Sequence, residues 1–283
     1  IYADGFAIAG LTELAKATGD QEPARIALET CHSVIRRLAA PGSYPTEPLD
    51  IPAGCKAHGI AMIFAKVFYD LGSYLNDSAI INAGLEHARE VMGVFRRPEK
   101  RLLYEFVGLD DAPIGRPPGK AVVPGHAIES MWFMIHIYQS LGDERRVREA
   151  IECIRWHIEL GWDSEFGGIL LARDATGTFW KDKEDTKIWW PHTEALYALL
   201  LAYSICGESW CLEWFHRVHD YAFAHFPSPH GEWIQRLDRH GRGIDNIAAM
   251  PVKDPFHLAR SLIHCSKVLE QLAARNTHRL KNA

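Results

Sequence analysis

Four stretches of the sequence repeat one design: an apolar-periodic helix, a short turn with a glycine and an acidic residue, and a second periodic helix. Their turn glycines are Gly19, Gly72, Gly142 and Gly207, which lie 53 to 70 residues apart. This spacing is too long for the common solenoid repeats, but it suits helical hairpins joined by substantial loops. The repeat therefore predicts an all-α fold, an α/α toroid whose inner ring holds the first helix of each hairpin.

Composition narrows the kinds of partner. The chain has 283 residues, of which 47% are hydrophobic and 24% charged, enough to bury the core of a large globular domain. A formal net charge of -5 without a basic block argues against a nucleic-acid partner. No apolar stretch approaches the ~20 residues of a membrane span, and no signal peptide precedes IYADGF, so a cytoplasmic location is expected.

The cysteines show no metal-binding or disulfide pattern. They are scattered, lack a CxxC pair and mostly fall within apolar helical runs, so buried reduced thiols are expected. The six are Cys31, Cys55, Cys153, Cys206, Cys211 and Cys265.

The loops between the hairpins are also alike. Residues 101–115, 167–180 and 231–243 each combine a strand-like run with an Asp and Gly turn, which is typical of β-ribbons on one rim. Each loop leads into the next inner helix through a proline and a histidine, and an earlier loop also ends in a histidine. The inner helices of a ring of hairpins run in one direction, so we expect these histidines to line one cavity. They are His58, His126, His192 and His257.

Charged side chains accompany two of these histidines at helical spacing. His126 and Glu129 are three residues apart and share a helix face, so the carboxylate can orient the imidazole or bind the same ligand. His257 and Arg260 have the same spacing, which adds a second imidazole and a cation.

Glu194 follows His192 by two positions, so only one of them can point straight into the cavity, and we favour Glu194. Aromatic residues crowd the same segments, and flat apolar rings edged by hydrogen-bonding groups suit the faces and hydroxyls of a sugar. These aromatic residues are Trp132, Trp180, Trp189, Trp190, Trp233 and Phe256.

Each of these features also has a structural explanation. A single histidine near a helix start is more often structural than catalytic, and Trp132 can be a core residue. Lys56 and Arg116 can be ordinary surface charges. His126 and Glu129 could ligate zinc, but no HExxH motif or third nearby ligand accompanies them, so we expect no metal.

Five segments resemble the N-acylglucosamine 2-epimerase family: YADGFAIAGLTELAKATGD, PGHAIESMWFM, WWPHTEALYALLLAY, GEWIQRLDRHG and PFHLAR. The family includes sugar 2-epimerases and aldose-ketose isomerases on an (α/α)6 barrel. Carried over by position, the resemblance implies that His126 and His257 are the catalytic histidines and that Glu129 and Glu194 assist them.

The resemblance also implies a sugar-binding set. Arg260 matches a sugar-site arginine, and Lys56 matches a substrate-binding lysine within a looser segment, GCKAHGIAMIF. His192 stands where many relatives carry glutamine, and both side chains can donate a hydrogen bond. The predicted substrate contacts are Arg260, Lys56, His58, His192, Trp189, Trp190 and Trp233.

Compared with the family barrel of twelve helices, the sequence begins at about the fourth helix, and we count nine. Residues 1–283 are therefore expected to form a single α/α-barrel domain, truncated at its N-terminus. The front segment supplies an active-site arginine in the family, so the chain is expected to be a fragment or to be closed by a partner. A homodimer is one such arrangement.

The implied reaction is 2-epimerisation of an aldose or N-acylhexosamine, in which one histidine removes the C2 proton and the other returns one to the opposite face of an enediolate. This scheme needs a small sugar substrate but neither an organic cofactor nor a metal. Three alternatives remain: aldose-ketose isomerisation at the same site, a glycoside hydrolase or lyase that uses Glu129 and Glu194, and a non-catalytic carbohydrate-binding or protein-interaction module.

Overall fold

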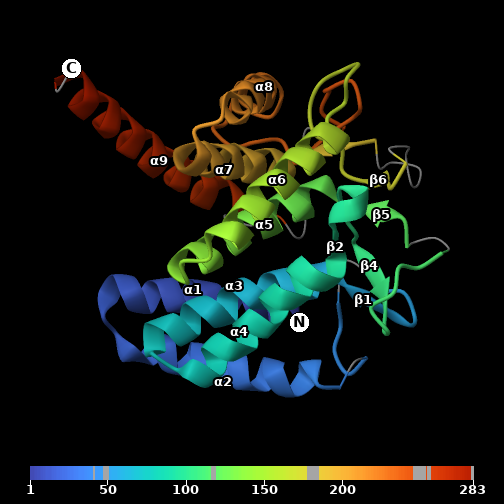
Figure 1. The fold of residues 1–283 in the computed structure, drawn as a ribbon, viewed down its shortest axis with the longest axis vertical. Coiled ribbons are helices and arrows are strands. Elements are labelled where there is room, and N and C mark those ends of the chain that lie inside the picture. The colour runs from blue at the N-terminus through green and yellow to red at the C-terminus, as the bar shows by residue number, and fades with distance from the viewer. Residues whose placement is uncertain are drawn as a thin grey trace. The chain divides into compact units, whose positions relative to one another are not determined.

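Helices make up most of the chain in the computed structural model, which describes residues 1–40, 42–46, 51–115, 119–176, 185–244, 253 and 256–281. Nine α-helices lie within these described residues, and the strands there are only two or three residues long, so the all-α prediction is confirmed. The helices are α1 (Tyr2–Thr18), α2 (Gln21–Leu38), α3 (His58–Leu75), α4 (Ser78–Glu90), α5 (Pro124–Ser140), α6 (Glu144–Gly161), α7 (Trp189–Cys206), α8 (Ser209–His225) and α9 (Phe256–Lys281) (Figure 1).

The hairpin turns follow the predicted glycines in three of four cases. Gly19 and Gly207 are the C-caps of α1 and α7 in the left-handed region, and Gly142 also has positive φ after α5. The prediction for Gly72 is wrong, because this residue lies inside α3 and the turn is made by Asn76 in the left-handed region. Gly72 instead allows close helix packing, since a Cβ there would lie 2.6 Å from the backbone nitrogen of Ile81.

The short strands pair differently from the predicted β-ribbons. In three of the four pairs, the segment that enters an inner helix pairs antiparallel with the loop before the next inner helix, so the partners are remote in sequence. Among the described strand pairs, β2 with β3 is the local hairpin, and an isolated antiparallel bridge joins Leu237 to Gly243 within the predicted ribbon at residues 231–243. The strands are β1 (Cys55–Ala57) with β4 (Phe106–Gly108), β2 (Arg96–Arg97) with β3 (Leu102–Leu103), β5 (Ala121–Val122) with β6 (Arg173–Asp174), and β7 (Lys187–Ile188) with β8 (Arg236–Leu237).

The chain divides into two compact units, residues 1–120 with 136–143 and residues 121–135 with 144–283. In the first unit, α3 is buried along most of its length and packs against α1 and α4. In the second unit, α7 is buried from Pro191 to Ala202 and packs against α8 and α9. A helix that is apolar on all sides belongs in a core, so the first helix of these hairpins is the inner one. The predicted single domain over residues 1–283 stays a prediction.

No helix within the described part of the chain is both long enough and apolar enough to cross a lipid bilayer.

Candidate active site

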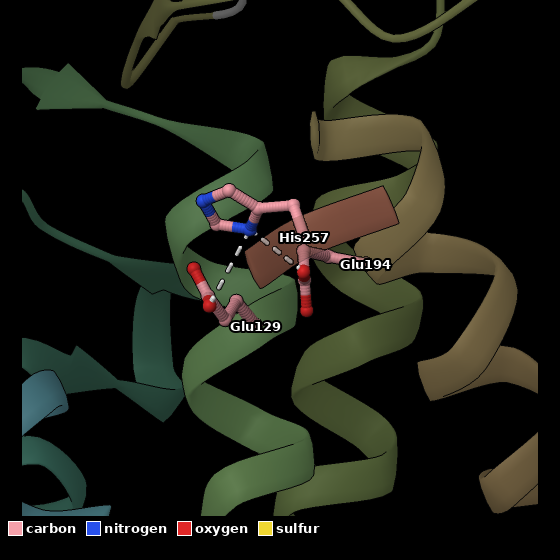
Figure 2. A group of neighbouring side chains, drawn as sticks. All are labelled: Glu129, Glu194 and His257. Atoms are coloured by element: carbon pink, nitrogen blue, oxygen red, sulfur yellow. Dashed lines mark hydrogen bonds and ion pairs between the residues drawn. The ribbon is translucent and has the colours of Figure 1, made fainter. Parts of the chain in front are cut away.

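Three side chains from three different helices meet in the second unit (Figure 2). The Nδ1 of His257, in the first turn of α9, lies 2.8 Å from Glu194 Oε1 on α7 and 3.9 Å from Glu129 Oε1 on α5. Both carboxylates are almost fully buried, whereas the His257 side chain is 15% exposed. The second ring nitrogen, Nε2, lies on the side of the ring opposite Glu194 (Figure 2). The hydrogen bond to Glu194 therefore fixes the Nδ1 side of the imidazole, and Nε2 takes no part in that bond.

Glu194 is surrounded by hydrogen-bond donors. Its Oε1 accepts from His257 Nδ1, from Arg260 Nη2 at 2.7 Å and from Ser261 Oγ at 3.3 Å, while Oε2 accepts from Trp132 Nε1 at 2.8 Å. Burial alone would raise the pKa of Glu194, but the Arg260 charge and the bonds from His257 and Trp132 outweigh burial and lower the pKa to about 2. Glu194 is thus an ionised carboxylate at neutral pH.

Arg260 links the two carboxylates, because its Nη2 also lies 3.2 Å from Glu129 Oε1. The guanidinium group lies over the ring of Phe256, with 3.6 Å between its carbon and the ring centroid, and 4.8 Å from the ring of Trp132. Stacking of this kind holds the planar cation in one orientation. Burial and the nearby charge of Glu194 raise the pKa of Glu129, although His257 and Arg260 act in the opposite direction.

His257 keeps its proton more strongly than an ordinary histidine. Burial alone would lower its pKa, but the charge of Glu129 and the hydrogen bond to Glu194 outweigh burial, so the pKa of His257 is raised. Glu194 therefore acts as the orienting carboxylate of this histidine, which leaves Nε2 as the atom that can exchange a proton with a ligand.

Trp190 connects His257 with the second predicted histidine. The ring centroid of Trp190 lies 5.5 Å from that of His257 and 5.0 Å from that of His126, with the His126 ring stacked on the indole. Gly125 makes this approach possible, because a Cβ there would lie 2.5 Å from the Trp190 ring. Pro124 begins α5, where a missing N–H costs nothing. The PGH sequence thus starts the helix and lets Trp190 lie against its first turn.

The cluster has the donor types of a metal site, since ligand atoms of Glu129, Glu194 and His257 lie within 4.8 Å of one another. In the structure, however, the positive charge beside both carboxylates comes from Arg260. This arrangement favours an ion-pair network rather than a bound cation at these three residues.

The sequence profile for N-acylglucosamine 2-epimerase (GlcNAc 2-epimerase) matches residues 75–261, which is more than half of the chain. The chain belongs to the N-acylglucosamine 2-epimerase family. The N-acylglucosamine 2-epimerases of Bos taurus and Rattus norvegicus are 29% and 28% identical to it over 290 residues, or 97% of this chain. The chain spans 66% and 67% of their lengths.

Solved structures give the fold of this family member. A sugar epimerase from a ruminal bacterium has a TM-score of 0.77 at 19% identity, and the alignment covers 95% of this chain and 71% of that one. The cellobiose 2-epimerase of Bacillus thermoamylovorans has a TM-score of 0.78 at 18% identity with the same coverage. The predicted (α/α)6 toroid fold is confirmed by these similarities.

Among the other predicted residues that the structure describes in this unit, Trp189 lies beside the cluster, with its ring centroid 6.2 Å from that of His257. Trp233 stacks on Phe226 at 5.6 Å, and no described contact joins it to the cluster. His192 is fully buried: Nε2 accepts from the Ile169 N–H and Nδ1 donates to the Ile188 carbonyl. Burial lowers the pKa of His192 to about 3, so the imidazole is neutral at pH 7. Both of its ring nitrogens are hydrogen-bonded to backbone atoms.

The two remaining predicted sugar contacts belong to the first unit. Lys56 Nζ lies 2.7 Å from Asp111 Oδ1 and 3.4 Å from Glu90 Oε1. His58 is fully buried, with its Nδ1 3.9 Å from Glu105 Oε2. Their roles as sugar contacts stay predictions. Arg116, Trp180 and the proline before Phe256 lie outside the described residues.

Two hydrogen-bond donors of the cluster, Trp132 and Ser261, are not predicted from the sequence pattern. Trp132 lies three positions after Glu129, and that spacing was the available signal, because it puts the indole on the same face of α5 as a predicted site residue.

Proposed function

We propose that this chain catalyses the removal and return of the C2 proton of an aldose or N-acylhexosamine, with His126 and His257 as the two proton-transfer groups. The observation that carries the proposal is the pair of imidazoles on one indole: both rings lie within 5.5 Å of Trp190, and one of them is oriented by a buried carboxylate. Membership of the N-acylglucosamine 2-epimerase family supports the substrate class.

The chemistry follows from what each group can do. In the open-chain sugar, the C2 proton lies beside a carbonyl, so its removal gives an enediolate, and inversion requires a proton to return to the opposite face. The raised pKa of His257 favours its protonated form, in which Nε2 can donate. His126 accepts the C2 proton, and the roles exchange in the reverse direction. Glu194 orients His257 by accepting the hydrogen bond from its Nδ1, and Arg260 in turn holds Glu194 in place.

The carboxylate pair does not favour a glycoside hydrolase. Glu129 and Glu194 both bond to one guanidinium nitrogen of Arg260, at 3.2 Å and 2.7 Å. In glycosidases the two carboxyl groups are separated by roughly 5 to 9.5 Å and flank the scissile bond. A sugar ring does not fit between two acids that share a ligand in this way.

The test is hydrogen exchange at C2. The protein is incubated in D2O with a panel of aldoses and N-acylhexosamines, and C2 deuterium uptake is followed by NMR. His126→Ala and His257→Ala should each lower the exchange rate by at least about 100-fold, because a positioned acid or base supplies about 100- to 10,000-fold. His216→Ala is the matched control, since His216 is exposed on α8, and it should exchange at the wild-type rate.

Wild-type exchange in either site variant would refute the assignment. The products separate the remaining candidates: a 2-epimer indicates epimerisation, a ketose indicates aldose-ketose isomerisation, and cleavage of oligosaccharides without exchange indicates a hydrolase or lyase. Sugar binding with neither exchange nor cleavage indicates a binding module.

The proposal also covers the partner molecule and the cellular compartment. A small sugar is the proposed partner, and a reducing compartment such as the cytoplasm agrees with six free cysteines, all within the described residues. The expectations of a homodimer, of no nucleic-acid partner and of no cofactor stay predictions.

A further inference from the structure

The turn between α7 and α8 brings two cysteines into contact. Cys206 is the last residue of α7, Gly207 caps the helix in the left-handed region, and Cys211 is in the first turn of α8. The Gly207 N–H donates to the Tyr203 carbonyl at 2.9 Å, which fixes the turn. As a result, the sulfur atoms of Cys206 and Cys211 lie 3.8 Å apart.

The two thiols differ in accessibility. Cys206 is half-buried beside the exposed residues Gly207, Glu208 and Ser209, whereas Cys211 is buried. A small reagent in solution therefore meets Cys206 first and finds Cys211 directly behind it. Burial raises the pKa of Cys211, and the neighbouring Cys206 and Glu208 raise it further, so Cys211 is a poor first nucleophile.

We propose that Cys206 and Cys211 form a reversible dithiol-disulfide site that low-molecular-weight disulfides, such as glutathione disulfide, oxidise. The Cys206 thiolate attacks one sulfur of glutathione disulfide, which forms a mixed disulfide and releases one glutathione. Cys211 then loses its proton and attacks the Cys206 sulfur, which forms the internal disulfide and releases the second glutathione. Two protein thiols are oxidised and one disulfide is reduced, so the exchange balances.

Little movement is required to close the bond. A disulfide has a sulfur-sulfur distance of about 2.0 Å, so the present separation must shorten by about 1.8 Å, which side-chain rotation can supply. The short turn keeps Cys211 next to Cys206 throughout, so closure of the mixed disulfide should outpace its reversal by free glutathione.

Peptide mapping tests the proposal. The native protein is treated with glutathione disulfide, its free thiols are blocked with iodoacetamide, and the denatured chain is cut after glutamate. Cleavage at Glu208 separates Cys206 from Cys211, so the two fragments stay joined only if the disulfide has formed. We expect joined fragments that separate on reduction, whereas Cys55, a half-buried thiol, remains alkylated or carries glutathione.

Two variants make the order of events visible. Cys211→Ser should hold at least about tenfold more glutathione on Cys206 than the wild type, because the resolving thiol is absent. Cys206→Ser should leave Cys211 unmodified until denaturation. The proposal is overturned if wild-type fragments separate without reductant, whether Cys206 carries stable glutathione or has not reacted. The wild-type result alone decides the matter if a variant fails to fold.

Discussion

Replacing Trp132 with phenylalanine should remove one hydrogen bond from the buried cluster and retain most of its packing. The indole N–H donates to Glu194 Oε2 at 2.8 Å, and Trp132 is 2% exposed. The remaining described bonds of Glu194, from His257, Arg260 and Ser261, all end on Oε1. Trp132→Phe therefore removes the hydrogen bond made by Oε2.

The magnitude follows from the charge of the acceptor. A hydrogen bond to a charged group contributes about 1.5–3 kcal/mol, so the free energy of unfolding at pH 7 should fall by about that amount. Since one pKa unit equals about 1.4 kcal/mol, the folded-state pKa of Glu194 should rise from about 2 by about one to two units. Glu194 then remains ionised at pH 7.

The sign of the pH dependence separates this bond from lost packing. The low folded-state pKa of Glu194 contributes stability above its unfolded pKa of about 4.3, and this contribution is lost as the pH falls through about 2. The difference between wild type and Trp132→Phe should therefore be constant above about pH 5 and narrow below about pH 4. A packing loss would be the same at every pH.

Urea unfolding at pH 7, 4 and 3 measures this difference, and Trp210→Phe is the matched control. Trp210 Nε1 donates to Glu208 Oε2 at 2.6 Å, but this bond is at the surface, so its loss should cost less than about 1 kcal/mol. The reasoning is refuted if Trp132→Phe costs no more than Trp210→Phe, or if the Trp132→Phe difference does not change between pH 7 and pH 3.

Two further predictions concern the free energy of unfolding. Asp163→Asn should lower it by about 3–5 kcal/mol, because the fully buried Lys187, 3.3 Å from Asp163, then loses its counter-charge. The control, Asp220→Asn, removes a carboxylate from the exposed pair with His219 and should have little effect. Gly125→Ala should lower the free energy of unfolding by about 1–3 kcal/mol, because the added Cβ clashes with Trp190. Its control is Gly10→Ala in α1, where the Cβ meets open space, and this change should raise the free energy of unfolding by about 0.5–1 kcal/mol. Urea unfolding measures both pairs of variants, and equal effects within a pair would contradict the explanation.

The sequence predicted the helical hairpins because their periodicity and turn residues are local properties. The mistake at Gly72 shows the limit of that reasoning. Glycine permits both a left-handed turn and close helix contact, and only the packing of α4 against α3 reveals which property is used. The strand pairing was missed for a related reason, since Ala121 pairs with Asp174 across 53 residues, and no local pattern marks such a partner.

The candidate site was predictable where a helix face determined it. Glu129 and Arg260 were found because each lies three residues after a histidine, and both project into the cluster. The indole bond to Glu194 was not found, because donor and acceptor are 62 residues apart and tryptophan has a more common role as a core residue. For His192 the position in the motif predicts a ligand contact, but in the folded chain its two ring nitrogens are hydrogen-bonded to the backbone of Ile169 and Ile188. The sequence pattern does not reveal those backbone partners.

The charges of the buried cluster explain why two of its pKa values shift in the same direction. Glu194 is ionised and is balanced by Arg260, which leaves Glu129 and His257 with atoms 3.9 Å apart. One proton on either member of this pair makes the whole cluster neutral, whereas losing it leaves a buried negative charge without compensation. Burial and the charge of Glu194 raise the pKa of Glu129, and the charge of Glu129 with the hydrogen bond to Glu194 raises the pKa of His257 against the effect of burial. In the proposed reaction, the negatively charged enediolate is a suitable acceptor for a proton from His257.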